Sequence, residues 1–230
     1  MMDKKNLFIL LGISLVTQAT TSLISGLFGI GPFTDTVNTK AAVNFIIDKL
    51  GVIYSSVYLQ IITALVIVVL GTALYYTGSQ INKTAATIAM GFYMVEAMLV
   101  IIEQILIFAI TEVSREYVIS DDTVQITIVK QLFALKDFCG AIAMIPFGLG
   151  AIIFYYLIMK AHVIPKWLGL WGLITVPVIL IGWSFEAFGV AVPFALYIPY
   201  VPWEWVAGIY IITKSKSIAN RINSASAIRA

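Results

Sequence analysis

Several continuous apolar segments in the sequence are long enough to cross a lipid bilayer, and residues 84–111 form the clearest of them. A hydrocarbon core of ~30 Å needs about 20 helical residues. Inside it, backbone polar groups can be satisfied only by helices or by a closed barrel. Barrel strands alternate in polarity at every second residue, whereas these segments are apolar throughout. The pattern predicts an all-α fold, a polytopic membrane helical bundle.

The composition agrees with this fold class. Of the 230 residues, 60% are hydrophobic and 11% are charged, with a mean hydropathy of +0.98, whereas soluble domains are about 25% charged. The formal charge of +2 gives no reason to expect a nucleic-acid partner. One cysteine, Cys139, and one histidine, His162, cannot build a thiolate or imidazole metal cluster or a bis-histidine haem site. We therefore expect no cofactor and no metal centre.

We predict one six-helix transmembrane domain over residues 1–213, followed by a basic cytoplasmic tail over 214–230. A segment at 39–50 has apolar positions at helical spacing behind a candidate N-cap, Thr39, but is too short to span. We expect it to be a short amphipathic interfacial helix. Residues 112–129 are polar and acidic, and we expect them to form a connector. The six predicted spans are residues 7–30, 54–77, 84–111, 132–159, 165–188 and 192–212.

The distribution of basic residues predicts the orientation. Six spans place both termini on one side, and the segments on that side hold nine lysines and arginines against four in the opposite loops. Because cytoplasmic loops carry the excess of Lys and Arg, we expect a multi-pass plasma-membrane protein with N-in and C-in topology, in contact with membrane lipids.

Ionisable side chains within the predicted spans are the candidate site residues. An ionisable group near the bilayer centre costs about 2.5–3.5 kcal/mol on insertion scales and usually marks a site or a buried partner. A rise of ~1.5 Å per residue places Glu96 and Glu204 near mid-membrane and the others in the outer half. Glu96 and Glu103 share one helix face about 10 Å apart. This separation suits two binding positions along a cavity. The six candidates are Glu96, Glu103, Lys136, Asp137, Glu186 and Glu204.

If these groups converge, carboxyls outnumber the lysine, and one or more would be protonated at neutral pH. Such a cavity would favour a proton or a small cation. Trp183 and Trp203 stand near two of the acids, and aromatic faces beside carboxylates can bind a small organic cation. Three prolines, Pro146, Pro199 and Pro202, are expected to break helices near the cavity.

Other interpretations of these residues stay open. Glu103 and Lys136 could form a static interhelical ion pair, Lys136 and Asp137 could belong to a helix start, and Glu186 could lie at the interface. Three functional hypotheses follow. The first is a transporter-like or ligand-binding membrane protein. The second is a non-catalytic subunit or assembly factor that pairs its acids with a membrane-protein partner or another copy. The third is an intramembrane enzyme that acts on lipid through carboxylate acid–base chemistry.

Three short motifs in the second half of the chain suggest a family. They are PFGLG at 146–150, VIPKWLG at 163–169 and PWEWVAG at 202–208. Together they resemble an uncharacterised prokaryotic membrane-protein family, the domain of unknown function 4386, whose Phe-Gly stretch, Pro-basic-x-Leu-Gly turn and late glutamate would correspond to 147–148, 165–169 and Glu204. The resemblance implies a six-helix membrane fold and carries no established activity.

Overall fold

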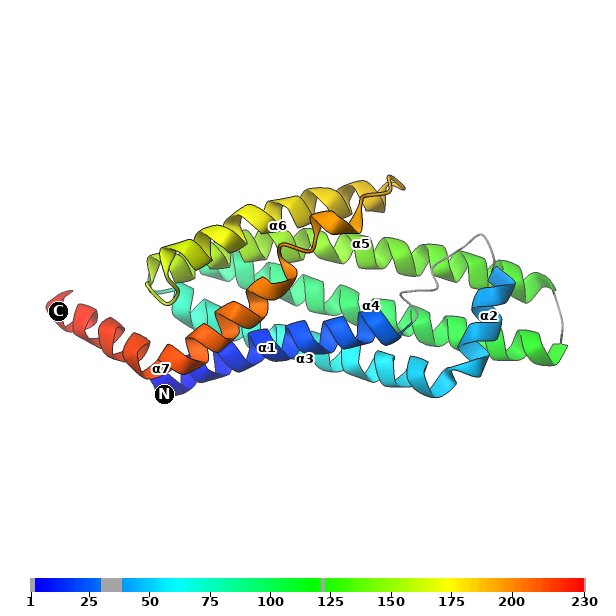
Figure 1. Ribbon diagram of the computed structural model, residues 1–230, viewed down its shortest axis with the longest axis horizontal. Helices are drawn as coiled ribbons and strands as arrows, with labels where there is room; N and C mark the ends of the chain where they lie inside the picture. Colours follow the sequence, from blue (N-terminus) through cyan, green and yellow to red (C-terminus); the bar gives the residue numbers. More distant parts are fainter. Residues whose placement is uncertain (1–2, 30–38, 121–122, 230) are drawn as a thin grey trace.

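The computed structural model describes residues 3–29, 39–120 and 123–229, with side chains described as far as Ser224. Figure 1 shows the long helices side by side in one bundle, with both chain termini at one end and α2 at the other. We call these the terminal end and the distal end. The described residues form seven α-helices and one 3-10 helix, with no strand among them: α1 (Lys4–Phe28), α2 (Thr39–Asp48), α3 (Leu50–Gly78), α4 (Lys83–Ser120), α5 (Thr123–Lys160), α6 (Lys166–Ala187), η3 (Phe194–Leu196) and α7 (Val201–Arg229).

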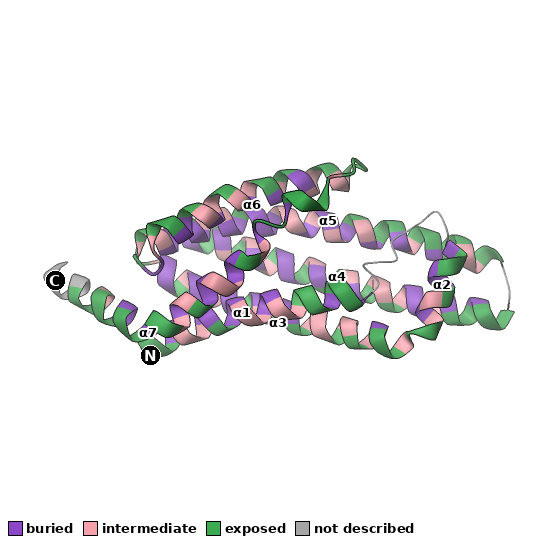
Figure 2. Ribbon diagram, viewed as in Figure 1, coloured by how far each residue is buried: buried purple, intermediate pink, exposed green. Residues whose placement is uncertain are grey.

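Within these ranges, five helices are long and apolar enough to cross a membrane: α1, α3, α4, α5 and α6. Their buried residues lie on the faces turned toward neighbouring helices, and exposed residues cover the outward faces (Figure 2). Many of the exposed side chains are large and apolar, such as Ile13, Met98 and Ile174. An apolar outward face matches lipid, so the chain is a multi-pass helical membrane protein.

Two predicted spans, 54–77 and 165–188, agree closely with α3 and α6. The predicted acidic connector at 112–129 is wrong, because α4 continues to Ser120 and α5 begins at Thr123. Residues 121–122 lie outside the described part of the chain, as does residue 30 at the end of the first predicted span. A helix of 38 residues is about 57 Å long, so α4 and α5 extend well beyond a ~30 Å hydrocarbon core.

A second hydrophobic core at the distal end explains these extensions. There α2, present close to the predicted 39–50, buries Val43 and Ile46 against Ile110 and Tyr117 of α4 and Phe133 of α5. Apolar side chains therefore recur along α4 and α5 between the charged residues that suggested a connector. The high density of charged residues in 112–129 made the helical spacing of its apolar residues hard to recognise from the sequence.

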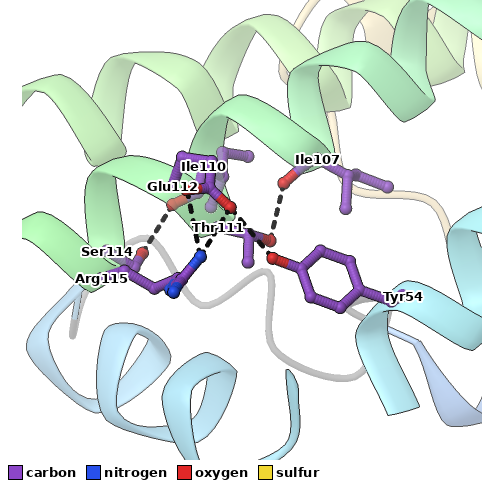
Figure 3. Close-up of polar contacts among 7 residues, drawn as sticks. All are labelled: Tyr54, Ile107, Ile110, Thr111, Glu112, Ser114 and Arg115. Atoms are coloured by element: carbon purple, nitrogen blue, oxygen red, sulfur yellow. Dashed lines mark hydrogen bonds and ion pairs between the residues drawn. The ribbon is translucent and has the colours of Figure 1, made fainter. Parts of the chain in front are cut away.

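A polar contact joins α3 to the distal part of α4 (Figure 3). The Tyr54 hydroxyl donates to Oε1 of Glu112 over 2.9 Å, and Arg115 pairs with the same carboxylate at 3.3 Å. Thr111 and Ser114 direct their hydroxyls back to backbone carbonyls of α4. Glu112 thus links two helices and does not belong to a loop.

Replacing Tyr54 with phenylalanine is expected to lower the free energy of unfolding by about 1 kcal/mol, because it removes one hydrogen bond to a carboxylate. Thermal unfolding of the purified protein in detergent would measure this loss. Tyr58→Phe is the control, since Tyr58 lies one turn later on α3 and is 69% exposed. Equal losses from the two changes would mean that the Tyr54 contact does not stabilise the fold.

The sixth predicted span, 192–212, is not one continuous helix. The chain passes from α6 through η3 and a turn that ends at Tyr200, and α7 begins only at Val201. Non-helical backbone at membrane depth needs protein partners for its polar groups, and Trp171 supplies one by donating its indole N–H to the Pro199 carbonyl at 2.8 Å. Figure 1 shows α7 crossing the bundle toward the start of α1 and continuing past it.

The prolines differ from their predicted role. Pro146 is buried inside α5, which runs unbroken through it, so the predicted helix break there is wrong. Proline removes one backbone donor, and neighbouring helices can hold a transmembrane helix together at that point; α5 packs closely on α4 and α6. Pro199 does precede a helix start, and Pro202 is the second residue of α7, where the missing N–H has no intrahelical partner to lose.

Candidate functional site

Three of the predicted acids, Glu96, Glu103 and Glu204, lie on the wall of one internal cavity. We call this the central cavity; its volume is about 170 Å³. Glu96 comes from the middle of α4 and Glu204 from the first turn of α7, and they are 2% and 7% exposed. Their carboxyl groups are close enough to interact electrostatically. The polar residues that line the cavity are Gln18, Ser22, Gln60, Thr63, Glu96, Glu103, Tyr200 and Glu204.

The Glu204 carboxylate is held by a chain of hydrogen bonds. Tyr200, just before α7, donates its hydroxyl to Oε1 at 2.7 Å, and the Tyr155 hydroxyl of α5 lies 2.8 Å from that of Tyr200. Gln18 of α1 donates its amide N–H to the same Oε1 over 3.5 Å. Since the donors come from three parts of the chain, Glu204 joins α7 to α1 and α5 at the cavity wall.

Glu96 differs from Glu204 in its hydrogen bonding. Its Oε2 atom is fully buried and has no hydrogen-bond partner among the described residues. The side-chain carbonyl oxygens of Gln18 and Gln60 are also buried without a partner, and both residues line the same cavity. Buried polar atoms are normally hydrogen-bonded. Three residues of the cavity wall, on α1, α3 and α4, therefore each carry a buried acceptor that has no partner among the described residues.

A larger cavity of about 680 Å³ adjoins the central one on the distal side, and we call it the distal cavity. The two share lining residues, among them Gln60, Glu103 and Gly140. The Asp137 side chain in its wall is 41% exposed, so the distal cavity reaches the protein surface. Glu103 lies where the two cavities adjoin, because it lines both of them.

The distal cavity is lined by Glu103 and by the other three predicted site residues, Lys136, Asp137 and Glu186. The ammonium group of Lys136 lies 2.8 Å from Asp137, so Asp137 is its direct ion-pair partner, and Glu103 interacts with both groups electrostatically without a direct ion pair. Lys136 is only 7% exposed and α5 begins at Thr123, which rules out a helix-start role. The Glu103 carboxylate lies against Gly140, whose lack of a side chain leaves room for it.

The aromatic residues near the acids have separate roles. Trp183 lines the distal cavity, stacked on Tyr197, and Tyr197 donates its hydroxyl to Glu186 at 3.0 Å. Trp203 and Trp205, on either side of Glu204, donate to the Leu168 carbonyl and to Thr20 instead. Neither is in the wall of either cavity. An aromatic box around Glu204 is therefore not formed.

The structure thus brings all six predicted residues to two adjoining cavities. Sequence reasoning missed Gln18, Gln60 and the two tyrosines. A detectable signal existed for the glutamines, because an amide inside an apolar span is nearly as conspicuous as a carboxylate. Tyr155 and Tyr200 gave no such signal, since tyrosine is common at membrane interfaces.

The arrangement suits ligands that bring positive charge. Carboxylate oxygens and amide carbonyl oxygens are acceptors only, and the lysine of the distal cavity is already ion-paired. The central cavity is too small for a drug-sized ligand, which needs about 300–1,000 Å³.

Comparison with known proteins gives one match. A model for the domain of unknown function DUF4386 matches residues 10–215, which includes every helix of the bundle except the start of α1 and the part of α7 beyond residue 215. No match was found among curated proteins or among solved structures. The match covers most of the chain and agrees with the motifs at 146–150, 163–169 and 202–208. The chain therefore belongs to the DUF4386 family of proteins of unknown function.

Proposed function

We propose that the protein binds or conducts a proton or a small cation through its two cavities, as a transporter-like or ligand-binding membrane protein. The observation that carries this proposal is that Glu96 lines the central cavity while its fully buried Oε2 has no hydrogen-bond partner among the described residues. A buried charge is costly unless it is paired, and the neighbouring carboxyl group of Glu204 adds to the repulsion. A proton or cation that arrives through the distal cavity would neutralise Glu96.

The proposed topology has six crossings, with α7 and the segment before it completing the sixth. Both termini would lie in the cytoplasm of a prokaryotic cell, and α2 would lie at the outer membrane surface. The termini share one end of the bundle (Figure 1), and that end carries nine of the fourteen basic residues. The positive-inside rule assigns such an end to the cytoplasm, so the distal cavity would open outward from the plasma membrane.

Flux in reconstituted vesicles tests the proposal. The wild type is expected to dissipate an imposed proton or sodium gradient, followed by trapped pH-sensitive and sodium-sensitive dyes. Glu96→Gln and Glu204→Gln are each expected to slow the flux by at least about tenfold, which corresponds to the loss of ~1.4 kcal/mol of interaction. Glu116→Gln is the matched control, because Glu116 is exposed at the distal end of the same helix as Glu96. Wild-type flux in both cavity variants would reject the proposal.

A second candidate, a subunit of a membrane complex, is favoured by Gln104. Its carbonyl oxygen is buried without a partner in a groove of about 530 Å³ between α3 and α4, lined by Tyr58, Ile105 and Phe108. A partner helix with a hydrogen-bond donor would fill this groove. Copurification of a stoichiometric partner that is lost on Gln104→Leu would support this candidate, and a homogeneous active monomer would exclude it.

A further inference from the structure

We infer that the central cavity binds one small monovalent cation, either a metal ion such as sodium or an ammonium ion, in exchange for a proton on Glu96. The cation would contact the oxygens of Glu96, Gln18 and Gln60. This inference rests on the proposed function and adds the chemical class of the ligand and the residues that hold it.

The number of unsatisfied acceptors favours a cation over a proton alone. A protonated carboxyl group has a single O–H and donates to one acceptor, so it would leave at least one of the two glutamine oxygens unsatisfied. A hard cation takes several oxygen ligands at once, and ammonium donates several hydrogen bonds. Since all three oxygen atoms are buried, each one left unpaired keeps its desolvation cost.

The orientation of Gln18 makes its oxygen available. Its amide nitrogen faces Oε1 of Glu204, which directs the carbonyl oxygen elsewhere in the cavity. Glutamine carbonyls are neutral, so the three oxygens of Gln18, Gln60 and Glu96 together carry the charge of one carboxylate. One monovalent cation balances that charge. Glu204 keeps its own contacts with Tyr200 and Gln18.

The exchange conserves charge. With no cation bound, a proton neutralises Glu96. When a cation enters, the Glu96 O–H bond breaks, the proton leaves, and the resulting carboxylate contacts the cation. Lys136 cannot take the place of the cation, because its ammonium group is bound to Asp137 in the distal cavity. Glu103 and Gln60 line both cavities, so they lie where an incoming cation and an outgoing proton must pass.

The size of the central cavity agrees with this ligand. One water molecule occupies ~30 Å³ of liquid, so a volume of about 170 Å³ holds a small cation with a few waters. Water alone would satisfy the acceptors but could not balance the carboxylate charge. The cavity thus has the volume and the charge for a partly hydrated monovalent ion.

Ion-dependent thermal stability of the purified full-length protein tests the inference. At constant ionic strength, choline chloride is replaced in turn by the chlorides of lithium, sodium, potassium and ammonium. The bound cation is expected to raise the melting temperature by about 8 °C when present at ~100 times its dissociation constant. In weak buffer, a pH-sensitive dye is expected to report release of about one proton per protein when that cation is added. The series separates a metal ion from ammonium.

Three variants separate this inference from the proposed function. Gln60→Leu is expected to abolish the ion-dependent shift, Glu96→Gln to abolish both the shift and the proton flux, and Glu116→Gln to change neither. If no cation shifts the wild-type melting temperature while carboxyl-dependent proton flux is intact, the cation inference is overturned and the proposed function stands. If the wild type shows neither ion-dependent stability nor flux, both are overturned.

Discussion

Gly208→Leu is expected to lower the free energy of unfolding by about 3 kcal/mol, which is at the upper end of the usual cost of inserting a larger side chain into a close-packed site. A Cβ atom built on Gly208 would lie 2.7 Å from the Gly12 carbonyl oxygen, and one on Gly12 would lie 2.6 Å from the Gly208 oxygen. Small residues let membrane helices approach at backbone distance. A backbone oxygen cannot move aside, so the leucine must push α7 away from α1. Because Glu204 lies one turn before Gly208, the cavity wall would open as well.

Thermal unfolding in detergent measures this effect, and a drop of roughly 9 °C in melting temperature corresponds to it. Gly91→Leu is the matched control, since a Cβ at Gly91 meets nothing within 4 Å. Replacing an exposed helical glycine is expected to be neutral or slightly stabilising. A melting temperature for Gly208→Leu equal to that of Gly91→Leu would show that the α1–α7 contact is not close-packed.

Trp203→Ala is expected to cost about 4 kcal/mol, because it empties the space of a fully buried indole. Trp203 is 0% exposed, its ring centroid lies 4.0 Å from that of Tyr155, and its N–H donates to the Leu168 carbonyl at 2.7 Å. Direct contacts between α6 and α7 are few, so this side chain supplies much of the attachment. Its loss would free the start of α7 from α6.

Two comparisons make this prediction specific. Trp203→Phe keeps most of the ring and loses the hydrogen bond, and is expected to cost about 1.5 kcal/mol. Trp167→Ala, at a 57% exposed position on the first turn of α6, is expected to cost less than ~1 kcal/mol. If Trp203→Ala is no more destabilising than Trp167→Ala, the start of α7 is held by other contacts. Unfolding monitored by tryptophan fluorescence would measure the loss of stability in each of the three variants.

The membrane bundle and the relative positions of the acids along it could be predicted because both depend on local sequence. Length and hydropathy identify a span, and a constant rise per residue converts position into depth. Glu96 and Glu204 are 108 positions apart in the sequence yet share one cavity, as depth alone suggested. The distal ends of α4 and α5 could not be predicted in the same way. Their charged residues face solvent while the buried side depends on α2, which no local pattern reveals.

The partners within the site were harder to predict for a physical reason. Lys136 had two carboxylates within reach, Glu103 on another helix and Asp137 beside it, and sequence contains no measure of their relative distances. The helix break before α7 likewise depends on Trp171 reaching the Pro199 carbonyl. Side-chain rotation and helix azimuth decide such contacts, and both are properties of the packed structure.

The pairing of α1 with α7 also constrains how the protein can be made. The bundle contacts of α7 are mostly with α1, and Gln18 and Thr20 of α1 meet Glu204 and Trp205 of α7. Chains fold from the N-terminus during synthesis, so these polar groups of α1 enter the bilayer long before their partners exist. The central cavity is therefore completed only when the last helix has been translated and inserted, and a ribosome that stalls before codon 204 leaves its wall open.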